Sequence, residues 1–109
     1  MKKFIDLGLS EQLISSISKL GHDTPTEIQK RSIPIILKEK DVIAESFTGS
    51  GKTLAFGCGI VEQVKPKKGL QALILTPTRE LAEQVKQALF ELSHGKKLNI
   101  LSIYGGVSI

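Results

Sequence analysis

Apolar residues near the start of the chain recur at the three- and four-residue spacing of an amphipathic helix. The members of this first run are Leu9, Leu13, Ile14, Ile17 and Leu20. Ser10 is a typical N-terminal cap and Gly21 is a typical stop, so the pattern predicts a helix between them.

A second helix is predicted from the segment Thr24-Pro25-Thr26-Glu27. This segment has the residue types of a capping box, with proline at the first helical position. The helix carries Ile28 and Gln29. It is expected to be interrupted or restarted at Pro34, because proline lacks the backbone N–H that a helix interior needs.

Three later runs are rich in apolar residues and lack polar alternation, as strands buried on both faces do. They are Asp41 to Ala44, Gln71 to Leu75 and Asn99 to Tyr104. Two helices alternate with them, one from about Lys52 to about Val64 and one after a cap at Thr78. The apolar face of the second helix comprises Leu81, Ala82, Val85, Ala88, Leu89 and Leu92. This alternation predicts an α/β fold in three layers, with helices on both faces of a parallel sheet.

The loop between the first predicted strand and the next helix has the pattern of a phosphate-binding loop. It consists of Ser46, Phe47, Thr48, Gly49, Ser50, Gly51, Lys52 and Thr53. Gly49 and Gly51 lack side chains, which lets consecutive backbone N–H groups point at the oxygens of a triphosphate. Lys52 adds a positive charge, and the Thr53 hydroxyl is the usual inner ligand of the Mg²⁺ that accompanies the nucleotide. The loop is a variant, because Ser46 stands where the strict pattern has glycine.

The alternative for this loop is an ordinary turn rich in Gly, Ser and Thr, with Lys52 as a solvated charge. That alternative leaves the paired glycines and the Gly-Lys-Thr ending unexplained. Lys52 and Thr53 are therefore the candidate catalytic residues of a nucleotide-binding protein with a P-loop NTPase fold.

The composition of the chain sets limits on its size and class, and it is consistent with the predicted fold. The chain of 109 residues corresponds to about one small domain. Its formal charge of +4 is compatible with an anionic partner but does not require one. The single Cys58 excludes an internal disulfide and is expected in the core. No apolar stretch approaches membrane-spanning length and the N-terminus does not resemble a signal sequence, so a soluble, cytoplasmic protein is expected.

The loops with candidate chemistry all follow predicted strand ends, where open parallel sheets bind ligands. They are Ser46 to Lys52, Thr76 to Arg79 and Gly105-Gly106. Two lysine clusters fall at the opposite edge of the predicted sheet and are interpreted as solvated loop charges rather than a nucleic-acid surface. They comprise Lys65, Lys67 and Lys68, and Lys96 and Lys97.

Four segments together resemble the DEAD-box RNA helicases. Phe4 with the run Gly21 to Gln29 resembles the Q motif of that family, and Ser46 to Thr53 resembles its motif I. Pro77-Thr78-Arg79-Glu80-Leu81 resembles motif Ia, and Gly105-Gly106 stands where the family has a pair of glycines. The resemblance covers essentially the whole chain in the family's order and spacing. There are two departures: Phe47 replaces a usual Gln, and His22 replaces a usual aromatic residue.

The resemblance implies a RecA-like fold and specific roles for these residues. It places ATP on Phe4, His22, Thr24, Gln29 and the phosphate-binding loop, with Mg²⁺ on Thr53. The amide of Gln29 matches adenine chemically, because it can accept from the N6 amino group and donate to N7. Taken without the motif, Gln29 and Phe4 are a helix-surface glutamine and a core phenylalanine. RNA backbone is expected on Pro77, Thr78, Arg79, Gly105 and Gly106, although Thr78 can also be a plain helix cap.

The carboxylates that hydrolysis requires are not evident in this chain. The acids after Lys52 are Glu62, Glu80, Glu83 and Glu91, and the spacing predicts that all of them lie on helices. In the family that the chain resembles, the Asp-Glu-Ala-Asp and Ser-Ala-Thr segments and a second domain would lie downstream. The chain is therefore expected to be the N-terminal fragment of a DEAD-box helicase, cut inside its first RecA-like domain.

This interpretation divides the chain into two parts. Residues 1–37 form an N-terminal helical segment with the Q motif, and residues 38–109 form the first half of an incomplete RecA-like ATP-binding domain. The parent protein is expected to couple ATP hydrolysis to the unwinding of RNA. Its expected partner is single-stranded or duplex RNA, and no association with a membrane is expected. Two alternatives stay open: this polypeptide is only a non-catalytic nucleotide-binding module, or it belongs to another P-loop helicase.

Overall fold

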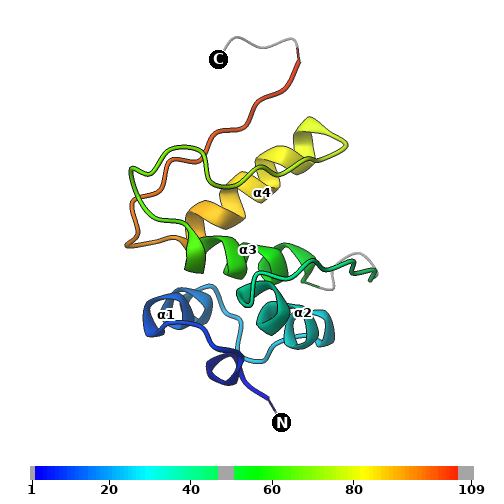
Figure 1. Ribbon diagram of the computed structural model, residues 1–109, viewed down its shortest axis with the longest axis vertical. Coiled ribbons are helices and arrows are strands. Elements are labelled where there is room, and N and C mark those ends of the chain that lie inside the picture. Colours follow the sequence, from blue (N-terminus) through cyan, green and yellow to red (C-terminus); the bar gives the residue numbers. More distant parts are fainter. Residues whose placement is uncertain (1, 47–50, 106–109) are drawn as a thin grey trace.

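Helices make up the regular structure of the described residues, which are 2–46 and 51–105 in a computed structural model. The elements in chain order are η1 (Phe4–Leu7), α1 (Glu11–Lys19), α2 (Glu27–Leu37), α3 (Lys52–Gln63) and α4 (Arg79–Leu92). Helix α3 occupies the middle and contacts α1, α2 and α4 (Figure 1). The helix that opens with the candidate phosphate-binding residues is therefore held on several sides.

Side-chain caps fix the starts of α1 and α4. The Ser10 hydroxyl accepts from the backbone N–H of Leu13 at 3.3 Å, as the sequence predicted for α1. The Thr78 hydroxyl accepts from the backbone N–H of Leu81 at 3.1 Å, which confirms the predicted cap of α4. Each cap satisfies one backbone donor that the first helical turn leaves without a partner.

The start of α2 differs from the prediction. Thr26 is the N-cap, rather than a residue inside the helix, and Pro25 lies before the cap. The backbone N–H of Thr26 donates to Oε1 of Gln29 at 2.9 Å, while the Thr26 hydroxyl accepts from the Gln29 N–H. Thr24 and Thr26 both stand three residues before a Glu or Gln, and the box at Thr26 prevails because Gln29 also bonds to the backbone of Gly51.

The predicted break at Pro34 is wrong, because α2 continues through it to Leu37. Tertiary packing compensates for the missing backbone hydrogen bond. Ile33 is fully buried, and Ile36 lies so close to Gly59 of α3 that a Cβ at Gly59 would collide with it. The absence of a side chain at Gly59 therefore permits the close α2–α3 contact that keeps the helix continuous.

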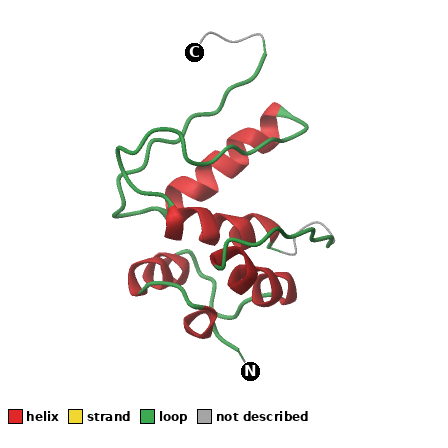
Figure 2. Ribbon diagram, in the orientation of Figure 1, coloured by secondary structure: helices red, strands yellow, loops and turns green. Residues whose placement is uncertain are grey.

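The predicted sheet is not confirmed by the structure itself. No strand is present in residues 2–46 and 51–105, and Figure 2 shows the three expected strand segments as loops. Their apolar side chains are largely uncovered: Ile43 is 98% exposed, Leu75 is 85% exposed and Leu101 is 74% exposed. A strand needs neighbours for its backbone hydrogen bonds, and these segments lack such partners among the described residues. The parallel sheet stays a prediction.

The core is built from side chains of all five helical elements. Its members are Phe4, Leu7, Leu9, Leu13, Ile17, Ile33, Leu54, Cys58, Val61, Val85, Leu89 and Leu92. Cys58 is fully buried, which confirms its expected place. Burial, assisted by the nearby charge of Glu62, raises the pKa of its thiol to about 12, so the thiol stays protonated and is not a nucleophile.

In the ranges 2–46 and 51–105, no helix combines the length and the apolar character needed to cross a bilayer.

Candidate functional site

A hydrogen bond between distant segments defines the centre of the candidate nucleotide site. Nε2 of Gln29 donates to the carbonyl oxygen of Gly51 at 3.1 Å, across 22 residues of sequence. Gln29 is only 2% exposed, which rules out the alternative of a helix-surface glutamine. Gly51 has a φ of 90°, and a Cβ there would collide with the amide of Gln29. The glycine requirement at Gly51 thus comes from both its backbone angle and its neighbour.

Two predicted phosphate-binding residues open helix α3. Lys52 is exposed and Thr53 is half-buried, in the first turn after the N-cap Gly51. No side chain of the described residues caps this helix, so its first backbone N–H groups stay available to an anion. The half-buried Ser46 ends the preceding described segment. Phe47, Thr48, Gly49 and Ser50 lie outside the described residues.

A hollow of about 260 Å³ lies beside this helix start. Four of the predicted nucleotide-binding residues line it: His22, Gln29, Gly51 and Thr53. The rest of the lining is Leu20, Leu54, Ala88, Glu91 and Leu92. The structure thereby brings the end of the candidate phosphate-binding loop together with part of the N-terminal motif, in a hollow lined by both apolar and polar side chains.

Two other predicted nucleotide-binding residues lie elsewhere. Phe4 is 4% exposed and belongs to the hydrophobic core, as its alternative interpretation expects. Thr24 is exposed on the connection between α1 and α2, and neither residue lines the hollow. Stacking of Phe4 on adenine and contact of Thr24 with the nucleotide stay predictions.

Sequence reasoning missed Glu91 as a residue of this hollow. Glu91 lies on α4 three residues after Ala88, a spacing that places side chains on one helix face. Nε2 of Gln87 donates to its carboxylate at 3.0 Å. The three-residue step from Ala88 could have revealed the position, because Ala88 was already assigned to the apolar face.

The candidate RNA-binding residues gather at the start of α4. Pro77, Thr78 and Arg79 are all exposed. The Thr76 hydroxyl donates to the backbone oxygen of Thr78 at 3.0 Å, which braces the turn before the helix. The Arg79 guanidinium lies 5.2 Å from the centroid of the Tyr104 ring, and exposed Gly105 follows Tyr104. Gly106 lies outside the described residues.

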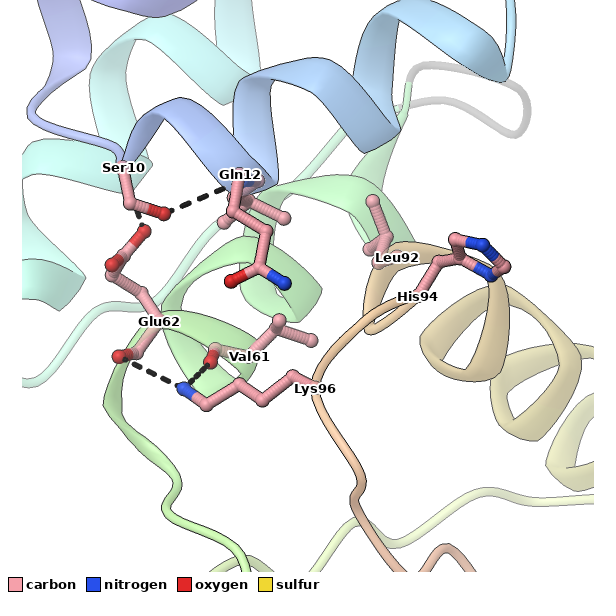
Figure 3. Close-up of a pocket in the computed structure, with 8 residues that line it drawn as sticks. Ser10, Gln12, Val61, Glu62, Leu92, His94 and Lys96 are labelled. Carbon is pink, nitrogen blue, oxygen red and sulfur yellow. Dashed lines mark hydrogen bonds between the residues drawn. The ribbon is translucent and has the colours of Figure 1, made fainter.

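A second hollow of about 220 Å³ lies between α1, the end of α3 and the segment after α4, and it shares Leu92 with the first hollow. In Figure 3, the Glu62 side chain points to Ser10, while the Lys96 side chain points to the backbone of Val61 and Glu62. The Ser10 N–H donates to the Glu62 carboxylate at 2.9 Å, and the Lys96 ammonium donates to the backbone oxygens of Val61 at 2.5 Å and Glu62 at 3.4 Å. Glu62 and Lys96 therefore link the start of α1, the end of α3 and the segment after α4.

The role of Lys96 corrects the sequence prediction. Lys96 is half-buried and holds the last carbonyls of α3, where a cation is favoured by the helix dipole, so it is not a solvated loop charge. Lys65, Lys67, Lys68 and Lys97 are exposed, as predicted. Spacing alone could not separate Lys96 from its neighbour Lys97.

A resident metal cluster does not emerge from the described side chains. No three His, Cys, Asp or Glu residues within 2–46 and 51–105 come together at a distance suited to a metal ion. A cation at the start of α3 would depend on oxygen ligands from the Thr53 hydroxyl and from a bound nucleotide.

Comparisons with known proteins agree with this geometry. A model of the family described as DEAD/DEAH box helicase matches residues 26–109. The chain is 49% identical over 106 residues to the RNA helicase CrhR of Synechocystis sp., covering 97% of the chain and 22% of the relative. It is 43% identical over 110 residues to the ATP-dependent RNA helicase CshA of Listeria monocytogenes, covering 100% of the chain and 21% of the relative.

Solved structures give the same result for the backbone. The chain matches the crystal structure of a DEAD box protein from the hyperthermophile Methanococcus jannaschii with a TM-score of 0.94 and 41% identity. The match covers 97% of this chain and 30% of that protein. The chain thus spans about a fifth of the length of the curated relatives it matches.

Proposed function

Because the chain belongs to the DEAD/DEAH box helicase family, we propose that it is the N-terminal, ATP-binding and RNA-binding part of an RNA helicase that couples ATP hydrolysis to unwinding. The relatives named RNA helicases support this proposal over 97% and 100% of the chain. The observation that carries it is the hydrogen bond from Gln29 to Gly51, because it joins the candidate adenine reader to the candidate phosphate loop.

In this proposal the base of ATP lies beside Gln29 and the phosphates lie at the start of α3. Lys52 and the first N–H groups of α3 bind the phosphates, since cations and helix N-termini both attract anions. Mg²⁺ fits the hydroxyl of Thr53, because this ion takes oxygen ligands and completes its shell with water and substrate phosphates. When bound, the ion would neutralise phosphate charge.

The amide of Gln29 retains the capacity that adenine recognition requires. Its Oε1 accepts one hydrogen bond from Thr26, and its Nε2 donates one to Gly51. A side-chain amide offers two lone pairs and two N–H donors, so one of each stays available. The remaining lone pair accepts from the adenine N6 amino group and the remaining N–H donates to N7, whereas guanine presents acceptors at both places.

Replacing Gln29 with alanine should remove the preference for ATP over GTP. We expect ATP binding to weaken by about 1 to 3 kcal/mol, because buried polar partners lose their hydrogen bonds, while GTP binding changes less. The measurement is titration of both labelled nucleotides into the full-length protein that carries this chain. An unchanged ratio of ATP to GTP affinity in the Gln29→Ala variant would refute the assignment.

Gln63→Ala is the matched control for Gln29→Ala. The Gln63 amide also links α2 to α3, donating to the backbone oxygens of Ile36 at 3.3 Å and Leu37 at 3.4 Å, but it lies at the far end of α3. Loss of this link should change stability without changing nucleotide preference. An equal loss of preference in both variants would indicate a general packing effect.

For RNA, we propose that Arg79 contacts a backbone phosphate rather than a base. Arg79 is exposed at the first position of α4, where the guanidinium and the helix N-terminus both favour an anion. Arg79→Ala should weaken the binding of all single strands alike and reduce the salt-dependence slope by about one unit or less.

Arg31→Ala is the control for Arg79→Ala, because Arg31 is the other arginine of the chain and is exposed on α2. Affinity and salt slope are measured by fluorescence anisotropy with several RNA sequences. A loss that depends on the RNA sequence would indicate base recognition instead of phosphate contact.

A further inference from the structure

The guanidinium of Arg79 lies over an aromatic ring that is hydrogen-bonded to the same helix. Tyr104 lies beneath it at 5.2 Å, and the Tyr104 hydroxyl donates to Glu83 at 3.3 Å. Ser102 donates to the same carboxylate oxygen of Glu83 at 2.6 Å. Ser102 and Tyr104 are two residues apart, and both face α4, because both donate to Glu83. The carboxylate therefore fastens the tyrosine to the helix that carries Arg79.

Glu83 stands one helical turn after Arg79, at a spacing that ordinarily allows an ion pair. Within residues 2–46 and 51–105, no carboxylate forms an ion pair with Arg79, and Oε1 of Glu83 instead accepts from the two hydroxyls. The Ser102 hydrogen bond, more than the Tyr104 hydrogen bond and the charge of Lys86, lowers the pKa of Glu83, so the carboxylate stays ionised and keeps accepting these bonds.

We propose that Tyr104 is a positioning residue for RNA binding: its ring holds the Arg79 guanidinium in place, and Glu83 with Ser102 fixes the ring. The inference rests on the proposed phosphate contact of Arg79. A guanidinium that lies over an aromatic face keeps its N–H edge free to bind a phosphate. It also loses less rotamer freedom when the phosphate arrives, because the ring already restricts it.

The test is a double-mutant cycle in the full-length protein, read as RNA affinity. Tyr104→Leu should weaken RNA binding about two- to fivefold, the size of an exposed cation–π contact. The same substitution should have no effect when Arg79 is already alanine, because the two side chains act as one unit. Tyr104→Phe keeps the ring but loses its hydrogen bond to Glu83, so it should weaken RNA binding less than Tyr104→Leu does.

Each outcome of the cycle supports or overturns a particular step. A Tyr104→Leu loss of equal size with and without Arg79 would overturn the positioning role and indicate a structural one. A silent Tyr104→Leu beside a damaging Arg79→Ala would overturn the positioning role alone. A silent Arg79→Ala would overturn the proposed phosphate contact and the positioning role with it. A Tyr104→Phe loss equal to that of Tyr104→Leu would assign the effect to the hydroxyl instead of the ring.

Discussion

Lys52→Ala should lower the affinity for ATP about 10- to 100-fold, because it removes a charge-assisted contact to the phosphates. Lys52 is exposed at the first position of α3, directly after Gly51, so its ammonium is accessible to an anion bound at the helix start. Truncation there leaves the cap Gly51 and the buried Gln29 in place, and the fold should be retained. Titration of labelled ATP against the parent and variant chains measures the loss.

Lys97→Ala is the control for the general effect of charge on ATP binding. Lys97 is an exposed lysine in the connection after α4, and its removal changes the net charge by the same amount. This variant should bind ATP as the parent chain does. Equal ATP affinity of Lys52→Ala and the parent chain would contradict the assignment of the phosphate-binding loop itself.

Helix positions follow from the sequence because the signals that determine them are local. Ser10 and Thr78 cap α1 and α4 as predicted, and α3 begins at Lys52 and ends at Gln63, one residue from the predicted end. A capping hydroxyl and an apolar face are both encoded within one or two turns of the chain. The start of a helix and its buried face can therefore be predicted from a short segment of the sequence.

Predictions at α2 were wrong where two local signals competed or where packing outweighed a local rule. Thr24 and Thr26 each satisfy the spacing of a capping box, and only the partner Gly51, 22 residues beyond Gln29, distinguishes them. Pro34 costs the helix one backbone bond, but contacts with α3 keep it continuous. Neither long-range contact can be deduced from spacing in the helix itself.

In the candidate site, too, the residues could be predicted from local motifs but their long-range contacts could not. The motifs identified His22, Gln29, Gly51 and Thr53, which the structure brings to one hollow. The bond between Gln29 and Gly51 could not be predicted, because it depends on how α2 packs against α3.

The predicted strands show that an apolar sequence pattern alone does not form a strand, because a strand needs neighbouring strands to pair with. The segments from Asp41, Gln71 and Asn99 are apolar, yet the described residues form no strand, and Leu73 is 76% exposed. Strand formation depends on hydrogen bonds to neighbours and on helices that cover the faces of a sheet. The solved relative matches this chain with a TM-score of 0.94 but is about three times as long, since the match covers 30% of it.

We expect the 109-residue chain alone to bind ATP without hydrolysing it. Phosphate transfer needs a carboxylate that holds Mg²⁺ and a group that orients the attacking water. Three of the four acids after Lys52 have other partners: Glu62 accepts from Ser10, Glu83 from Ser102 and Tyr104, and Glu91 from Gln87. All four lie on α3 or α4, as the sequence predicted. Binding and turnover should therefore separate in this polypeptide.

The measurement is phosphate release, with and without RNA, from the 109-residue chain and from the full-length protein that carries it. The longer polypeptide should release phosphate faster when RNA is added, whereas the short chain should give the rate of a buffer blank. A Lys52→Ala version of the longer protein controls for contaminating ATPases, because it should lose turnover together with ATP binding. RNA-stimulated release by the short chain would contradict the prediction, since its own carboxylates would then suffice for the chemistry.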